Sequence, residues 1–399
     1  MKSGHSPELM VLLQVCTINL SADRKSKLVN YIAEYPLNWE RLYTLATWHR
    51  LTPFLYRTLQ DVPDIPEGFL TRIQNDCRLS AADTLLKLHE YHQVATLLTK
   101  YGIEHMAYKG VFFAKNCYPD SSLRVCGDID ILIGTKDAPK AIRLLQLHKY
   151  HLNQLHTSYW NYDNHSLLDD LPEVSLFKPF FGHHFDIDLH WSIVCFNKHY
   201  KSFQLSDSLS HPTFATELHI VLLVTHHGLT NLWQRIYYIN DLYFLLNDKV
   251  IDWTWLLQTL RQHGLEKVFL MGLLWCHQIW ELPLPDSVKA LVDGNNLKSL
   301  LVVCERKWEE NQAIEGSNLV VKQLIFFTKA QTQFNKLLKI YGTFLTSRVF
   351  RASIFKIGKR MIYIPENWGF ITIFIRATRS LYRFTLSPSG VNPAREQGK

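Results

Sequence analysis

The chain has 399 residues, of which 47% are apolar, 13% aromatic and 20% charged, and this composition excludes an intrinsically disordered protein. The net charge of +7 is unevenly distributed, because 14 basic and only 2 acidic residues follow from Asn318 onward. The rest of the chain is net acidic. A uniformly basic nucleic-acid binder is therefore excluded, and any contact with a polyanion or a membrane surface is expected in the C-terminal fifth.

The seven cysteines are scattered, odd in number and never spaced as Cys-x-x-Cys. This pattern argues against a disulfide framework or a zinc knuckle and fits a reducing compartment. The first twenty residues contain one lysine, an early Glu8 and a short apolar run, which is not the pattern of a secretory signal. No stretch has the length of uninterrupted apolar residues that a membrane-spanning helix requires. We therefore expect a cytoplasmic protein.

The first half of the chain predicts helices followed by strands. Apolar residues recur at steps of three and four over 7–100, where glycines are few, so this part is predicted to be helical. The period then changes, and short strands are predicted over 103–108 and 128–133. A helix is expected after the second strand, over about 135–150, with a proline near its first turn.

The second half is predicted to be mainly helical. The aromatic stretch 159–181 gives no firm strand assignment, whereas 184–193 alternates clearly and predicts a strand. Helical spacing returns over 215–282. Basic helical stretches are expected at 318–339 and 347–359, and an amphipathic segment with three arginines on one helical face follows at 368–382.

The strand over 128–133 contains the motif Gly-Asp-Ile-Asp-Ile-Leu-Ile. Residues two apart in a strand face the same side, so Asp128 and Asp130 project together. Two carboxylates held close repel one another unless a cation lies between them, and a divalent metal with oxygen ligands is the usual solution. An isolated Asp-x-Asp is common, however, and a solvated strand face would explain this motif on its own.

A second acidic strand favours the metal-site interpretation. Its alternation puts His184, Asp186, Asp188 and His190 on one face. Three carboxylates then meet if the two strands are neighbours, and two metals bridged by three carboxylates suit phosphoryl and nucleotidyl transfer. The alternative is a zinc or iron site built from the His-x-Asp-x-Asp-x-His run alone, which would leave the first acid pair without a role.

Cationic residues that could hold a triphosphate lie near the first acid pair. Lys109 and Gly110 are predicted where a strand ends and a helix begins, and Arg124 precedes Asp128 by four residues. A lysine that extends along the surface to water and an ordinary surface arginine are equally good interpretations of these two side chains.

Several segments together resemble the uncharacterised nucleotidyltransferase family of the polymerase-beta-like superfamily. The resemblance covers about residues 8–285, and the tail only loosely. The segments that carry it are Tyr108-Lys109-Gly110, Tyr118-Pro119, Leu123-Arg124, the run from Gly127 to Ile133 and Asp188-Leu189-His190-Trp191, with Trp48-His49-Arg50 upstream and His226-His227, Trp233, Asp241-Leu242 and Asp252-Trp253 downstream. The superfamily's Gly-Ser or Gly-Gly turn close to the first acid is replaced here by Lys109-Gly110.

The resemblance implies an α+β fold, with a small mixed nucleotidyltransferase sheet and flanking helices between helical N- and C-terminal regions. The implied division is a helical region 1–100, a nucleotidyltransferase core 101–200, a helical domain 201–285 and a basic helical region 286–399. It also implies two Mg2+ ions and an NTP co-substrate, most simply ATP. Asp128, Asp130 and Asp188 would be the metal ligands and catalytic residues, with Asp188 also helping to deprotonate the acceptor hydroxyl.

Lys109, Gly110, Arg124, His226 and Asp241 are the residues predicted to contact the nucleotide. His226 and His227 face different sides of one helix, and a buried, hydrogen-bonded histidine is the simpler outcome for either. Asp241 could equally cap a helix.

Two functions are therefore compared. The first is a Mg2+-dependent nucleotidyltransferase that moves a nucleoside monophosphate to a hydroxyl or similar acceptor on a small molecule or polypeptide. The second is a catalytically silent nucleotide-binding regulatory or adaptor protein. In both, the basic tail would dock onto an acidic partner, a membrane surface or the acidic body of the same chain. No specific nucleic-acid recognition is expected.

Overall fold

A computed structural model describes most of the chain in two compact units, which are treated separately. The described residues are 4–17, 20–153, 156–157, 160, 173–192, 215–311, 316–331, 337–338, 341–342, 353–357, 360–364 and the positions 368, 370–371, 374–375 and 378. The first unit comprises Met1–Asn153, Pro172–Cys195 and Ser202–Leu337, and the second comprises Gln154–Leu171, Phe196–Lys201 and Leu338–Lys399. The four-region division made from the sequence stays a prediction.

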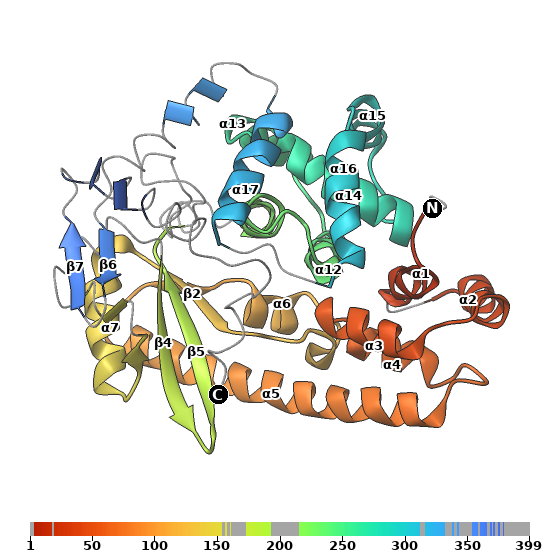
Figure 1. Ribbon diagram of the computed structural model, residues 1–399, viewed down its shortest axis with the longest axis horizontal. Helices are drawn as coiled ribbons and strands as arrows, with labels where there is room; N and C mark the ends of the chain where they lie inside the picture. Colours follow the sequence, from red (N-terminus) through yellow and green to blue (C-terminus); the bar gives the residue numbers. More distant parts are fainter. Residues whose placement is uncertain are drawn as a thin grey trace. The chain divides into compact units, whose positions relative to one another are not determined.

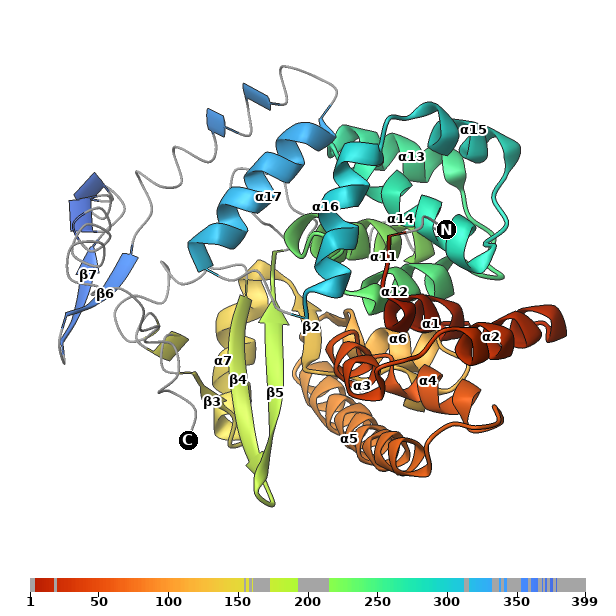
Figure 2. The ribbon, with the colours of Figure 1, turned by 45° about the vertical axis from the view of Figure 1, so that its right-hand side comes forward.

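The N-terminal part of the first unit is helical, as the spacing predicts. Its helices are α1 (Pro7–Val15), α2 (Ala22–Glu34), α3 (Trp39–Trp48), α4 (Thr52–Leu59) and the long α5 (Glu67–Lys100). Ser6, Ser21 and Asn38 cap the first three helices, because each side chain accepts a hydrogen bond from a first-turn N–H group. The short α3 and α4 lie alongside one end of α5 (Figure 2).

A five-stranded mixed sheet follows, which confirms the α+β class. Its strands are β1 (His105–Ala107), β2 (Ile129–Ile133), β3 (His151–Leu152), β4 (Glu173–Phe180) and β5 (His183–His190), in the order β1-β2-β5-β4-β3. Only the β2–β5 pair is parallel, whereas β1, β4 and β3 each pair antiparallel with their neighbour. The helices α6 (Gly110–Asn116) and α7 (Ala138–Leu147) connect the strands, with the 3-10 turn η1 (Ser121–Leu123) before β2. Figure 1 shows β2, β5 and β4 side by side.

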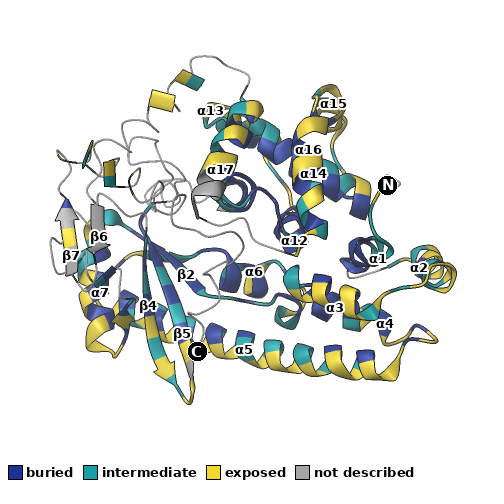
Figure 3. Cartoon of the chain, in the orientation of Figure 1, coloured by how far each residue is buried: buried dark blue, intermediate teal, exposed yellow. Residues whose placement is uncertain are grey.

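Strand β2 lies between β1 and β5 and is buried on both faces. All five of its residues are buried, including Asp130 and Leu132 on the face that the motif predicts to be acidic (Figure 3). Strand β5 keeps the predicted alternation as far as Leu189, because Phe185, Ile187 and Leu189 are buried while Asp188 is half-buried. His190, predicted on the same face as Asp188, is buried as well. The carboxylate of Asp130 therefore lies inside the protein, where it requires partners.

Helices complete the first unit after the sheet. They are α11 (Ala215–Leu223), the π-helical η4 (Val224–Thr230), α12 (Ile236–Leu246), α13 (Trp253–Gln262), α14 (Glu266–Trp280), α15 (Asp286–Gly294), α16 (Lys298–Glu309) and α17 (Gly316–Ala330). Indole N–H groups connect this part: Trp308 Nε1 donates to the Trp233 carbonyl over 2.8 Å, and Trp233 Nε1 donates to Val268 over 3.1 Å. Every helix in the described ranges is too short or too polar to cross a lipid bilayer.

The C-terminal prediction needs one correction. Part of the helix expected over 347–359 is instead a two-stranded antiparallel sheet of β6 (Ser353–Ile357) and β7 (Arg360–Ile364). Ile, Phe and Tyr are frequent in this part of the sequence, and this composition favours strands and outweighs the helical spacing of the basic residues. The arginine face at 368–382 lies largely outside the described residues, so its docking stays a prediction.

Candidate metal and nucleotide site

The parallel pairing of β2 and β5 brings the two acidic motifs together. Asp130 and Asp188 occupy the same register position on these adjacent strands. Asp130 is almost completely buried, at 1% exposure, while Asp188 is half-buried. Adjacent strands lie about 4.8 Å apart, so two side chains at one register position on the same face are neighbours. Two carboxylates from segments about sixty residues apart thus meet in the centre of the sheet.

Two cationic side chains bind the buried carboxylate of Asp130. Lys109 Nζ donates to Asp130 Oδ1 over 2.7 Å, and His190 Nε2 donates to the same oxygen over 2.9 Å. The other ring nitrogen of His190, Nδ1, lies 2.7 Å from Oε2 of Glu173 on β4. The result is a chain of alternating charges that crosses three strands and the loop before α6.

These contacts set the protonation states. Burial alone would raise the pKa of Asp130, but Lys109 and His190 outweigh it and hold that pKa well below its usual range. Burial and Lys109 oppose protonation of His190, yet Glu173 and Asp130 raise its pKa to about 9. His190 is therefore an imidazolium at neutral pH, with both nitrogens donating to carboxylates.

Asp188 differs from Asp130 because no cationic side chain among the described residues forms an ion pair with it. Burial raises its pKa to about 6, against a hydrogen bond from Ser175, and the charges of Asp130, Glu173 and Asp128 add to the increase. A carboxylate with this pKa is poised between its two protonation states near neutral pH. It can accept a proton or bind a cation.

Asp128 lies just before β2 and is also half-buried. The charge of Asp130 is the largest cause of the raised pKa of Asp128, followed by burial, while Lys109 and Arg50 oppose the increase. The acids therefore repel one another, as the sequence motif predicts. A divalent cation would relieve that repulsion.

The ligand atoms fit such a cation. Among the described residues, one atom each of Asp130, Asp188 and His190 lie within 4.8 Å of one another. Carboxylate oxygens suit a hard cation such as Mg2+, whereas both nitrogens of His190 are already committed to carboxylates. Asp128 is outside this group, and its role as a ligand stays a prediction. From the His-x-Asp-x-Asp-x-His run, His184 and Asp186 are exposed and pair with each other beside the β4–β5 turn.

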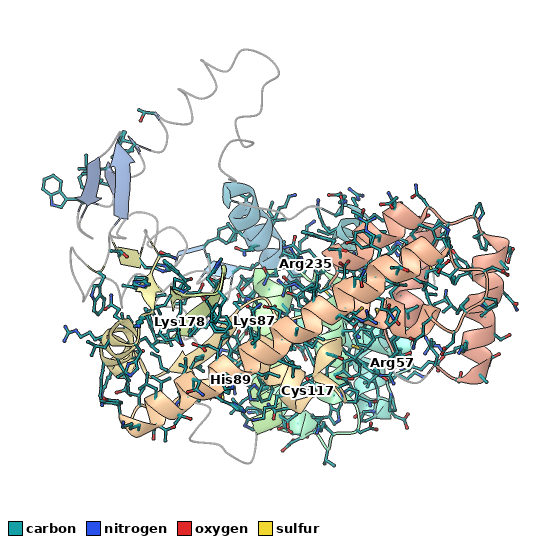
Figure 4. The ribbon with its side chains drawn as sticks, turned by 90° about the horizontal axis from the view of Figure 1, so that it is seen from below. Arg57, Lys87, His89, Cys117, Lys178 and Arg235 are labelled. Carbon is teal, nitrogen blue, oxygen red and sulfur yellow. The ribbon has the colours of Figure 1, made fainter. Side chains whose placement is uncertain are left out.

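The backbone before α6 positions Lys109 and Gly110. Lys109 has φ 55° and ψ −128°, an unusual conformation for a residue with a side chain, and it points Nζ at Asp130. A Cβ on Gly110 would lie 3.2 Å from the Asp128 carbonyl oxygen, so glycine permits the close approach of this loop to β2. Lys87 on α5, labelled in Figure 4, donates to the Cys126 carbonyl over 3.0 Å and so fixes the segment just before β2.

Arg124 and Asp241 bind each other in a second buried cluster. Arg124 donates from Nε and Nη2 to the two oxygens of Asp241 over 2.7 and 2.8 Å. Tyr118 adds a hydrogen bond of 2.8 Å and His227 Nε2 one of 3.1 Å, and the guanidinium also stacks on Tyr237. Asp241 lies inside α12, so the helix-cap interpretation is wrong.

The two histidines of η4 take different roles. His227 is buried, and burial lowers its pKa to about 4 against the hydrogen bond to Asp241. His226 is half-buried and its ring lies edge-on to Tyr108, whose ring also contacts His190. Burial lowers the pKa of His226, with Lys109 and His227 adding to the effect. His226 thus faces the Asp130 cluster, and its contact with nucleotide stays a prediction.

Sequence reasoning missed several residues that the structure places at or beside the site. Glu173 could have been found from its register position opposite His190, but that requires β4, which was not assigned. The sequence shows His190 as part of the second acidic motif, but it does not show that the imidazole is charged. Arg50 lies far from the acid pair in the sequence, so its nearness to Asp128 leaves no pattern from which to predict it.

Paired carboxylates on neighbouring strands of a small mixed sheet, with buried cations around them, define a protein with a candidate acidic site for a divalent cation. A family model described as uncharacterised nucleotidyltransferase matches residues 35–281, and the chain belongs to this family. The matched region contains all three acids and both predicted cations. Searches of curated proteins and of solved structures each give no significant match.

Proposed function

We propose that the protein is a Mg2+-dependent nucleotidyltransferase that moves a nucleoside monophosphate from an NTP, most simply ATP, to a hydroxyl or similar acceptor. The observation that supports this most directly is the position of Asp130 opposite Asp188 in the only parallel pair of the sheet. Membership of the nucleotidyltransferase family supports the same reaction class. The free cysteines among the described residues agree with the cytoplasm as its location.

Each residue has a part in the proposed reaction. Asp130 and Asp188, with Asp128, would hold Mg2+, which neutralises phosphate charge and lowers the pKa of the acceptor hydroxyl when bound. The acceptor oxygen would form a bond to the α-phosphorus as the bond to the β-phosphate oxygen breaks and pyrophosphate leaves. Asp188 would also help to take the proton of the acceptor hydroxyl.

Label transfer from an α-phosphate-labelled NTP in the presence of Mg2+ tests the proposal, with small-molecule and polypeptide pools as acceptors. Asp130→Asn and Asp188→Asn should each reduce transfer by about a thousandfold, because both carboxylates are required for the metal. Asp186→Asn is the matched control, since Asp186 is an exposed acid two residues away on the same strand. Wild-type activity in Asp130→Asn would refute the proposal.

One observation favours the silent nucleotide-binding protein as a second candidate. Lys109 and His190 already occupy Oδ1 of Asp130, so an internal ammonium competes with a metal for that oxygen. Stabilisation by Mg2+ and NTP without label transfer to any acceptor pool would favour this candidate over the enzyme.

A further inference from the structure

A third cation lies beside the acidic site, in addition to the two predicted from the sequence. Lys109 and Arg124 are each bound to a buried carboxylate, Asp130 and Asp241. Arg50 is half-buried and, among the described residues, forms no ion pair. It nevertheless lies close enough to Asp128 for its charge to oppose, together with that of Lys109, the increase in the pKa of that carboxyl. Arg50 is therefore a cation whose hydrogen-bonding capacity is open to a ligand.

The backbone at Arg50 is strained. Helix α3 ends in a Schellman turn, in which Leu51 N–H donates to Ala46 over 2.8 Å and Arg50 N–H donates to Thr47 over 3.1 Å. The residue at this position has a left-handed conformation, here φ 54°, and it is usually glycine. An arginine at a position that favours glycine for folding indicates a use for its side chain.

Two neighbours hold the guanidinium in place. Its central carbon lies 5.1 Å from the centroid of the Tyr237 ring, on which it stacks. It also covers Gly127, the residue before the first acid, because a Cβ added there would lie 2.8 Å from Nη2 and 3.1 Å from Nη1 of Arg50. Gly127 thus provides the space that brings the guanidinium beside the carboxylates. The group is pre-organised, which reduces the entropy lost when it binds.

We propose that Arg50 binds the triphosphate of the NTP at this site, an inference that rests on the proposed nucleotidyltransferase function. A guanidinium offers paired donors that match two phosphate oxygens, and such charge-assisted contacts are the strongest hydrogen bonds that proteins make with phosphate. Arg124 is held in a bidentate pair by the buried carboxylate of Asp241, which is costly to break, and Lys109 already directs one of its three N–H groups at Asp130. Arg50 binds it without breaking an ion pair.

Calorimetric titration with Mg·ATP and with inorganic tripolyphosphate plus Mg2+ tests this role. Arg50→Ala should weaken both by about 10- to 100-fold, the effect of losing hydrogen bonds to a charged group. Binding of Mn2+ alone, followed by electron paramagnetic resonance, should not weaken, because removing a positive charge beside Asp128 does not lower the affinity of the carboxylates for a cation. Arg50→Lys should recover part of the affinity. Arg57→Ala, which removes an exposed arginine from the neighbouring α4 (Figure 4), should change neither.

Three outcomes would overturn the inference. Unchanged affinity of Arg50→Ala for both phosphate ligands would exclude Arg50 as their partner. An equal loss of Mn2+ affinity would show that Arg50 only supports the carboxylates. If the wild type binds neither Mg·ATP nor tripolyphosphate, the proposed function and the inference about Arg50 both fail. If the wild type binds them and Arg50→Ala binds them equally well, only the inference about Arg50 fails. Arg50→Gly relieves the left-handed backbone, so it should fold and give the same loss of phosphate binding as Arg50→Ala.

Discussion

Two buried cation–carboxylate pairs in one chain have opposite designs. In the Lys109–Asp130 pair, one ammonium and one imidazolium share a single oxygen. Two further carboxylates, Asp128 and Asp188, lie nearby, and neither forms an ion pair within the part of the chain that the structure describes. The Lys109 side chain keeps 10% of its surface exposed. Charge is crowded here and only partly compensated, which is the condition for binding an additional cation.

The Arg124–Asp241 pair is complete. Both oxygens of Asp241 accept from Arg124 in a bidentate pair, and Tyr118 and His227 provide one further hydrogen bond each. The Asp241 side chain is fully buried. The difference between the pairs indicates that the second joins the turn before β2 to α12, and a contact of Arg124 or Asp241 with nucleotide stays a prediction.

The histidines of the two clusters show the same contrast. His190 has two carboxylate partners and its pKa is raised to about 9, so it is charged. His227 also donates to a carboxylate, but Arg124 already neutralises Asp241, and burial lowers the pKa of His227 to about 4. A histidine hydrogen-bonded to a carboxylate is thus cationic in the cluster around Asp130 and neutral in the cluster around Asp241.

Removing the carboxylate from each pair should give the largest difference in stability. Asp241→Asn leaves the buried guanidinium of Arg124 without a counter-charge and should lower the free energy of unfolding by about 3–5 kcal/mol. Asp130→Asn should cost less than about 2 kcal/mol, because it also removes repulsion from Asp128 and Asp188. Urea denaturation of both variants measures the two values. Equal losses in the free energy of unfolding would mean that the two carboxylates contribute equally to folding.

Because His227 is neutral in the folded protein, the cluster around Asp241 should lose stability in acid. The pKa of His227 is about 4 in the folded protein and about 6.5 in the unfolded chain, so the unfolded state binds more protons below pH 6.5. Its contribution to stability is present above pH 6.5 and is lost as the pH falls through 4, by at most about 3 kcal/mol. His49 and His219, also lowered to about 4, add to the same loss.

Denaturation curves between pH 7 and 4 measure this loss. His227→Gln, which keeps an amide donor for Asp241 and does not titrate in this range, is the matched variant. Its stability should fall less steeply with pH than that of the wild type. Parallel pH profiles for the two proteins would show that His227 is not a neutral histidine in the fold.

Removing the ammonium of Lys109 tests the Lys109–Asp130 pair. Lys109→Met keeps the length of the side chain but frees Oδ1 of Asp130 from the ammonium that now lies 2.7 Å away. Affinity for Mn2+ should increase by about tenfold, or about 1.4 kcal/mol, because the metal no longer competes with an internal charge. Electron paramagnetic resonance titration measures the change. A lower affinity would instead assign Lys109 to support of the metal site.

The sequence predicts the strands that carry the site better than it predicts which charged side chains pair there. The alternation of the two acidic strands depends only on the period of a β-strand, which is why the α+β class and the buried face of β5 are confirmed. The partners of Arg124 and Lys109 were not predictable in this way. Asp241 is 117 residues from Arg124, and contacts between distant segments leave no local pattern.

Two local errors have physical causes too. Glu173 escaped because the aromatic stretch before β4 has no clear alternation, and without β4 nothing places a carboxylate opposite His190. The basic spacing over 347–359 predicted a helix, whereas β-branched and aromatic residues on both sides of Gly358 form strands. Charge spacing is weak evidence for a helix when the residues between the charges favour a sheet.

The smallest predicted effect is on the free energy of unfolding, and it tests whether Arg50, unlike Arg124, is dispensable for folding. A glycine at position 50 removes the penalty of a left-handed side-chain residue, about 1–2 kcal/mol, and loses the stacking on Tyr237, about 0.5–1 kcal/mol. Arg50→Gly should therefore match or exceed the wild type in stability, by up to about 1 kcal/mol, whereas Arg50→Ala, which keeps the strain, should be slightly less stable. Urea denaturation measures both. A clear loss of stability in Arg50→Gly would make Arg50 a structural residue like Arg124, whereas retained stability would mean that the strained arginine serves a purpose other than folding.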